Sequence, residues 1–205
     1  AAPRLLWERS SEDRYGDRGA FVTRRDARGR SVLHILSDGK TAFLRGNGAS
    51  TEGDRPFLDR FDLTTGQSTR SFQSAAPYYE TVVDLLDDRG ERLLTRRESV
   101  SEPPNLWQRD LVRRIAPQQL TQFKDPAPEF TGVRTERVSY KRRDGVTLHA
   151  TVHLPPGYDK ARDGALPFLL WAYPLEFGSA DAASQVTGSP YRFTRPGGSS
   201  HLFAL

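Results

Sequence analysis

Short apolar segments separated by turn residues dominate the first 125 positions of the chain. Three pairs of such segments predict β-hairpins, because a polar turn lies between the two members of each pair. The pairs are 31–36 with 41–44, 57–63 with 68–72, and 106–111 with 119–123. The first pair reverses at Asp38-Gly39, a dipeptide typical of tight hairpin turns. Residues 78–86 form a further apolar segment, and their β-branched side chains favour a strand over a short helix.

The second and third predicted hairpins repeat one another. In each, a proline precedes the first strand, Asp-Leu ends it, and the second strand closes on Phe. Asp62-Leu63 and Asp110-Leu111 lie 48 residues apart. A period of about 40 to 50 residues with several strands per unit is typical of β-propeller blades, which stack to cover their faces. A β-sandwich of similar strands is the alternative.

The pattern changes after residues 124–129, where two prolines in three positions favour an extended, non-repetitive backbone. Residues 148–154 alternate apolar with polar side chains, which predicts a half-buried strand. Residues 167–173 are continuously apolar, which predicts a central strand covered on both faces. A half-buried strand followed by a fully buried one indicates the first strands of an α/β sheet.

Composition and charge argue against several classes of function. The chain has 30 Lys and Arg against 26 Asp and Glu, with the two signs interspersed, so we expect no nucleic-acid binding. It contains no Cys, which excludes disulfides, thiolate metal ligands and a thiol nucleophile. No segment approaches the roughly 20 apolar residues that span a bilayer. We expect a soluble protein without a membrane partner. Its compartment stays open, because a removed signal peptide for a periplasmic or secreted protein leaves no trace.

Three motifs in the last third of the chain carry a family resemblance. They are Arg-Asp-Gly-Val at 143–146, Leu-Pro-Pro-Gly-Tyr at 154–158 and Leu-Trp-Ala-Tyr-Pro-Leu-Glu-Phe at 170–177, with supporting segments at 46–53, 56–59, 78–83 and 181–190. In this order they resemble the prolyl oligopeptidase family of serine peptidases, closest to its glutamyl endopeptidase branch. The resemblance implies a mixed fold of two incomplete parts. Residues 1–130 would form the last blades of a β-propeller, and residues 131–205 the first strands of an α/β-hydrolase domain.

The resemblance also implies a Ser-Asp-His triad, but the chain has no G-x-S-x-G motif to hold the serine. The nearest imitation, Gly-Gly-Ser-Ser-His at 197–201, has His where the second Gly belongs. By resemblance, Tyr173 donates its hydroxyl hydrogen bond to the oxyanion of the tetrahedral intermediate. A tyrosine bonded locally at a strand end is the alternative. Glu176 and Arg192 are candidates for the active-site mouth, where Arg192 would bind an acidic substrate side chain.

Other candidate sites have simpler interpretations. His149 and His153 lie on a predicted strand, where four residues span roughly 13 Å, too far for one metal ion. Gly46-Asn47-Gly48 is expected to form a turn and not a phosphate loop, because Thr51 takes the third Gly position. Glu80, Asp84 and Asp87-Asp88 are expected on a solvated edge and not as paired catalytic carboxylates. We therefore expect no metal and no cofactor.

The sequence thus predicts part of a serine endopeptidase whose complete form cleaves peptide substrates after Glu. The chain alone is predicted to be inactive, because the triad is absent from it. The alternative function is a non-catalytic β-rich module that binds a protein or a peptide. A complete β-sandwich interaction domain is the third hypothesis, and the sequence leaves the oligomeric state open.

Overall fold

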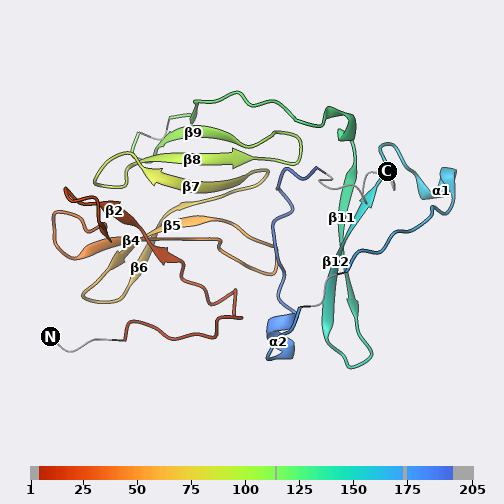
Figure 1. Ribbon diagram of the computed structural model, residues 1–205, viewed down its shortest axis with the longest axis horizontal. Helices are drawn as coiled ribbons and strands as arrows, with labels where there is room; N and C mark the ends of the chain where they lie inside the picture. The colour runs from red at the N-terminus through yellow and green to blue at the C-terminus, as the bar shows by residue number, and fades with distance from the viewer. Residues whose placement is uncertain (1–4, 114, 173–174, 196–205) are drawn as a thin grey trace.

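The computed structural model describes residues 5–113, 115–172 and 175–195, which are mostly antiparallel β-structure (Figure 1). None of the described helices has the length and apolar character needed to cross a membrane. The strands are β1 (Ala20–Phe21), β2 (Thr23–Arg25), β3 (Ser31–Leu33), β4 (Thr41–Gly46), β5 (Phe57–Asp62), β6 (Ser68–Gln73), β7 (Tyr79–Leu85), β8 (Arg92–Glu98), β9 (Asn105–Asp110), β10 (Gln118–Gln119), β11 (Arg134–Lys141) and β12 (Thr147–Leu154). The helices are the 3₁₀-helix η1 (Pro128–Phe130), α1 (Lys160–Asp163) and α2 (Ala180–Ala183).

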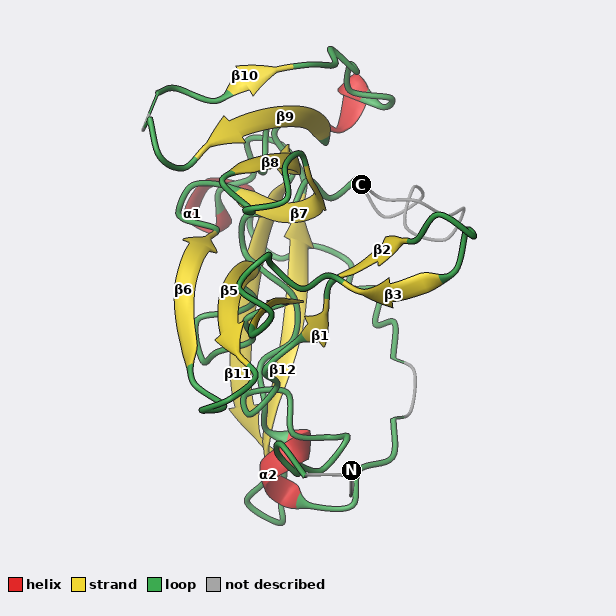
Figure 2. Cartoon of the chain, turned by 90° about the vertical axis from the view of Figure 1, so that its left-hand side faces the viewer, coloured by secondary structure: helices red, strands yellow, loops and turns green. Residues whose placement is uncertain are grey.

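Two four-stranded antiparallel sheets form the N-terminal part of the molecule. The first has the strand order β1-β4-β5-β6 and the second β10-β9-β8-β7. Strands β2 and β3 pair with each other, as do β11 and β12. The two four-stranded sheets lie one above the other at one end of the molecule, and the β11–β12 hairpin stands at the opposite end (Figures 1 and 2).

A single apolar cluster joins the two four-stranded sheets. It contains Val22, Phe43, Leu58 and Phe72 from the first sheet region, and Val82 and Leu93 from the second. Side chains alternate between the two faces of a strand, so each sheet directs one apolar face toward the other. The sheets therefore pack face to face, whereas every residue of β11 is exposed.

Most of the predicted strands are confirmed. β5 pairs with β6, residues 79–85 form β7, and 147–154 form the half-buried β12. The third predicted hairpin is partly right, because β9 pairs with β10, but β10 covers only Gln118–Gln119 and residues 120–123 form no strand. The first predicted hairpin is only partly right. Its reversal exists, since the Leu36 backbone N–H donates to the Thr41 carbonyl at 2.8 Å and Ile35 bridges Ala42. The ladder partner of β3, however, is β2 and not β4.

The repeat found in the sequence corresponds to equivalent places in the two sheets. Asp62 ends β5 and Asp110 ends β9, and each of these strands is the third in its sheet when counted from the strand earliest in the chain. The Oδ1 atom of each aspartate accepts hydrogen bonds from the backbone N–H groups two and three positions further on. The same side-chain cap thus starts the same turn in both sheets.

The predicted central strand at 167–173 is wrong for the part that the structure describes. Residues 167–172 form no strand, and Phe168, Leu170 and Trp171 are 77%, 72% and 68% exposed. A central strand needs a neighbour along each edge. In the described C-terminal part, β11 and β12 pair only with each other, so the apolar run has no sheet to enter.

The turn after β3 lowers the pKa of the Asp38 carboxyl group, and this effect can be measured. The hydroxyl of Thr41, followed by the backbone N–H groups of Lys40 and Thr41, lowers the pKa of Asp38 from 3.8 to about 2. Because the pKa is lower in the folded state, the stability that Asp38 contributes is fully present above about pH 3.8 and is lost as the pH falls through about 2. We expect an NMR titration of its carboxyl carbon to have a midpoint near 2.

Thr41→Val is the matched variant for this titration, because it removes the hydroxyl donor and keeps the side-chain shape. It should move the midpoint back toward 3.8. A wild-type midpoint at 3.8 would contradict the hydrogen-bonding scheme at this turn.

Candidate functional site

Residues 178–195, which we call the return segment, connect the C-terminal part of the chain back to the two four-stranded sheets. The segment lies between those sheets and the β11–β12 hairpin (Figure 1). The Asp54 backbone N–H donates to the Gly188 carbonyl at 2.8 Å, which ties the middle of the segment to the loop before β5. Near its end, the Arg195 guanidinium pairs with the Asp125 carboxylate at 2.6 Å. These contacts are polar, and they join residues far apart in the sequence.

The N-terminal segment before β1 also holds the return segment. The Gln185 side-chain oxygen accepts from the Arg14 backbone N–H at 2.7 Å, and its nitrogen donates to Asp13 at 3.0 Å. That hydrogen bond is the largest cause of the lowered pKa of Asp13. The Tyr15 hydroxyl accepts from the Val186 backbone N–H at 2.7 Å. The side chains of Asp13 and Tyr15 and the backbone of Arg14 therefore hold residues 185–186 against the segment before β1.

A buried carboxylate lies where the return segment crosses the second sheet. The Glu98 side chain is 1% exposed and accepts from Arg96 Nη1 at 3.1 Å and from the Phe193 backbone N–H at 2.9 Å. Arg192 Nε lies 3.9 Å from Glu98 Oε1, and its guanidinium lies 5.1 Å from the centre of the Tyr79 ring. Burial raises the pKa of Tyr79. In this structure the charge of Arg192 is directed at Glu98.

Two of the three predicted site residues, Glu176 and Arg192, lie within the described part of the chain. Arg192 contacts Glu98 and Tyr79, while Glu176 is exposed, and no contact among the described residues joins Glu176 to Arg192. Tyr173 lies outside the described residues, as does the serine-containing run at 197–201.

Glu80 is buried, so the prediction that it lies on a solvated edge is wrong. Its side chain is 2% exposed and forms a bidentate pair with Arg109, in which both N–O distances are 2.6 Å. The Thr95 hydroxyl donates to the same carboxylate at 2.5 Å. A signal was present in the sequence, because Glu80 and the buried Val82 share one face of β7. Asp84, by contrast, is exposed as predicted.

The two histidines of β12 lie on a strand, as predicted. His149 Nδ1 lies 2.8 Å from the Ser139 hydroxyl oxygen and its Nε2 lies 3.0 Å from the Ser184 carbonyl oxygen. His153 Nδ1 lies 3.2 Å from the Thr135 hydroxyl oxygen. Within the described ranges, no group of three or more His, Cys, Asp or Glu side chains could hold a metal ion.

A polar pocket of about 690 Å³ lies beside the first sheet. Residues 15–18, 48–52 and 66–68 line it, together with side chains from β5, β6 and the residues next to them. Gly48 is needed in this wall, because its φ is +60° and an added Cβ would lie 2.1 Å from the Arg55 carbonyl oxygen. A second pocket of about 420 Å³ shares Tyr15 and Thr51 with the first and reaches His149. The two pockets therefore adjoin.

Comparison with known proteins gives strong matches over the full sequence. No protein-family model matches the chain. The whole chain aligns at 42% identity over 221 residues with "Probable glutamyl endopeptidase, chloroplastic" of Arabidopsis thaliana, and at 43% over 220 residues with the protein of the same name in Oryza sativa subsp. japonica. It covers 22% and 23% of those two proteins, so it spans less than a quarter of their length.

Solved structures give a weaker likeness. Two structures of the AtxE2 isopeptidase, one in the apo form and one of a variant with a bound ligand, have TM-scores of 0.38 and 0.36 and identities of 15% and 16%. Each match covers 67% of this chain and 22% of the isopeptidase. At these scores the structural likeness supports no assignment, and the family rests on the sequence matches.

Proposed function

We propose that this chain belongs to the glutamyl endopeptidase family and forms part of a serine peptidase of the prolyl oligopeptidase type that cleaves peptides after Glu. The observation that carries the proposal is the identity of 42% to 43% along the whole chain with two proteins of that name. The peptide substrate is then the partner of the complete protein.

Within that protein, we assign residues 1–130 to the last blades of a β-propeller. Two four-stranded antiparallel sheets that pack face to face support this assignment. The repeated aspartate cap on the third strand of each sheet also supports it, since blades are repeats of one unit.

We assign residues 131–205 to the start of an α/β-hydrolase domain. The β11–β12 hairpin and the exposed apolar run at 167–172 fit this assignment, because further strands would give that run neighbours to pair with. The triad would come from other residues of the complete protein. Tyr173 is the proposed oxyanion donor, and Glu176 and Arg192 are proposed to lie at the mouth of the site.

The chain alone is expected to have no peptidase activity, because an oxyanion donor without a nucleophile does not cleave an amide. The measurement compares this chain with the complete protein on Glu-containing peptides, with and without a covalent serine-protease inhibitor. Inhibitor-sensitive cleavage after Glu by the complete protein alone is the expected result. Inhibitor-sensitive cleavage by the 205-residue chain, or none by the complete protein, would overturn the proposal.

A non-catalytic peptide-binding module is the second candidate function. The 690 Å³ polar pocket favours it, because this pocket belongs to the sheet region and contains no candidate nucleophile activated by a histidine. A complete protein that binds Glu-containing peptides and leaves them intact would favour this second function.

A further inference from the structure

We propose that the 690 Å³ pocket, which we call the arginine pocket, binds a carboxylate side chain of a peptide through Arg18 and Arg55. The inference rests on the proposed function in one respect, since it takes the ligand to be a peptide. It adds a specificity-determining site on the sheet region, away from the residues that the sequence singled out.

Three arginines line the arginine pocket, and one of them is already neutralised. Arg70 forms an ion pair with the buried carboxylate of Asp59. Its guanidinium also lies 4.2 Å from the centre of the Phe57 ring. Arg70 is thus held by a charge and an aromatic face, and it forms part of the wall.

Arg18 and Arg55 are the two lining arginines whose charge is available. Among the described residues, neither takes part in an ion pair. Arg55 Nε donates to the Ser74 carbonyl at 3.2 Å, which fixes the guanidinium through one nitrogen and leaves its two Nη groups for a ligand. The guanidinium carbon of Arg18 lies 5.8 Å from the centre of the Trp7 ring. A guanidinium fork matches the two oxygens of a carboxylate.

The acidic side chains of the arginine pocket do not cancel these two charges. Asp17 pairs with Arg9 at 3.1 Å, and Asp59 pairs with Arg70. Glu52 is the remaining acidic lining residue, and within the described part of the chain it has no ion pair. The lining therefore has two positive charges, of Arg18 and Arg55, and one negative charge, of Glu52, without an ion-pair partner among the described residues. This balance favours an anionic group on the ligand.

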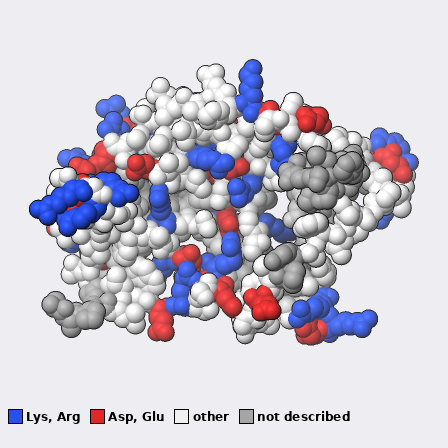
Figure 3. Space-filling model, in the orientation of Figure 1, with Lys and Arg blue, Asp and Glu red and all other residues white. Residues whose placement is uncertain are grey.

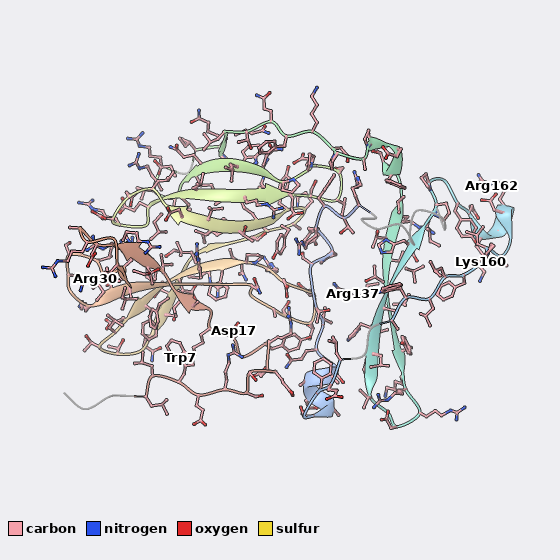
Figure 4. The ribbon with its side chains drawn as sticks, in the orientation of Figure 1. Trp7, Asp17, Arg30, Arg137, Lys160 and Arg162 are labelled. Carbon is pink, nitrogen blue, oxygen red and sulfur yellow. The ribbon has the colours of Figure 1, made fainter. Side chains whose placement is uncertain are left out.

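The position of the arginine pocket suits an extended peptide. The adjoining pocket shares Tyr15 and Thr51 with it and is also lined by His149 of β12 and Gln185 of the return segment. Asp17, which lines the arginine pocket, lies between Trp7 and Arg137 of β11 in Figure 4. Figure 3 shows basic and acidic side chains mixed over this central part of the surface. A peptide held at Arg18 and Arg55 could continue toward the β11–β12 hairpin, where the proposed peptidase part begins.

The test measures binding of two fluorescein-labelled eight-residue peptides to the purified chain by fluorescence anisotropy. The peptides are identical except for one central Glu or Gln. Wild type should prefer the Glu peptide about tenfold, and Arg18→Gln and Arg55→Gln should each remove most of this preference without weakening the Gln peptide. Arg28→Gln is the matched control, because Arg28 is an exposed turn residue that does not line either pocket. It should leave the preference unchanged.

Thermal unfolding of each variant shows whether it is folded. Arg55→Gln removes the hydrogen bond to the Ser74 carbonyl and can destabilise the loop. In that case Arg18→Gln is the decisive variant, because the Arg18 side chain forms no hydrogen bond with the described backbone. Equal binding of the two peptides by wild type, or an unchanged preference in Arg18→Gln, would overturn the inference.

Arg192→Gln provides a competing variant. Loss of the preference in Arg192→Gln alone would assign carboxylate recognition to the return segment and would also overturn the inference. Because anisotropy needs no turnover, failure here is distinct from failure of the proposed peptidase. A complete protein that cleaves after Glu in the Arg18→Gln, Arg55→Gln double variant as in wild type would reject only the arginine pocket.

Discussion

Arg109→Met is expected to lower the free energy of unfolding by about 3–5 kcal/mol, because it leaves a buried carboxylate without its cation. Glu80 is 2% exposed, and both of its oxygens bind the Arg109 guanidinium at 2.6 Å. After the substitution, the Thr95 hydroxyl at 2.5 Å would be the one side-chain donor to this carboxylate among the described residues. Methionine keeps the unbranched stem, so the loss reports the charge more than the packing near Phe72.

Urea unfolding followed by tryptophan fluorescence measures this loss, and Arg113→Met is its control. The Arg113 side chain is 78% exposed and pairs with Asp110 at 3.7 Å, so its removal should cost less than about 1 kcal/mol. Adding Glu80→Met to Arg109→Met should recover much of the stability, because no buried charge is then left unpaired. If Arg109→Met and Arg113→Met unfolded at the same urea concentration, the Glu80 pair would not be a stabilising interaction.

Tyr173→Phe in the complete protein is expected to lower kcat by about 10²–10³-fold while KM changes little. The proposed hydroxyl donates to an oxygen that becomes negatively charged only in the transition state, so its loss affects the chemical step more than substrate binding. Phenylalanine keeps the ring, which separates the hydrogen bond from the packing of the side chain.

Steady-state kinetics on a Glu-containing peptide, with kcat and KM determined separately, test this role. Tyr140→Phe is the matched control, because Tyr140 is an exposed tyrosine on β11 and should leave both constants unchanged. A tyrosine bonded only to its neighbours would give a different pattern. Its replacement would lower the thermal unfolding midpoint and leave kcat within a few-fold of wild type, and this outcome would remove Tyr173 from the proposed mechanism.

The strands of the sheet region could be predicted because their signals are local. Asp38-Gly39 specifies a reversal by its own backbone preferences, and the Asp62 and Asp110 caps act over only three residues. The pairing of β3 with β2 could not be predicted from the same signals. Choosing between two possible partner strands depends on contacts with the rest of the sheet.

The errors at Glu80 and at 167–172 have different physical causes. At Glu80, the polar side chain predicts exposure, whereas the two-residue period of the strand predicts burial; the carboxylate is buried because Arg109 pairs with it. At 167–172, the apolar run predicts burial, but burial requires neighbouring strands that the described residues do not supply. An apolar segment is favoured to be buried, but it is buried only where neighbouring elements are present to cover it.

The candidate site was the least predictable part of the molecule. The Arg192–Glu98 approach and the arginine pocket both combine segments that are distant in the sequence. Arg18 and Arg55 belong to separate loops, and no local pattern marks either as a partner of the other. The sequence resemblance leads to Tyr173, and position and charge lead to Glu176 and Arg192, whereas only the folded chain reveals which arginines lack a carboxylate.

The ion pair between Arg195 and Asp125 has a mechanical consequence. The chain passes between its two parts twice, first through the residues around Asp125 and again through the return segment, and this pair fastens the two crossings to each other. One flexible connection would let the β11–β12 part rotate about several axes relative to the sheets. Two crossings joined by an ion pair restrict that rotation. They keep the arginine pocket and β12 within reach of the same peptide.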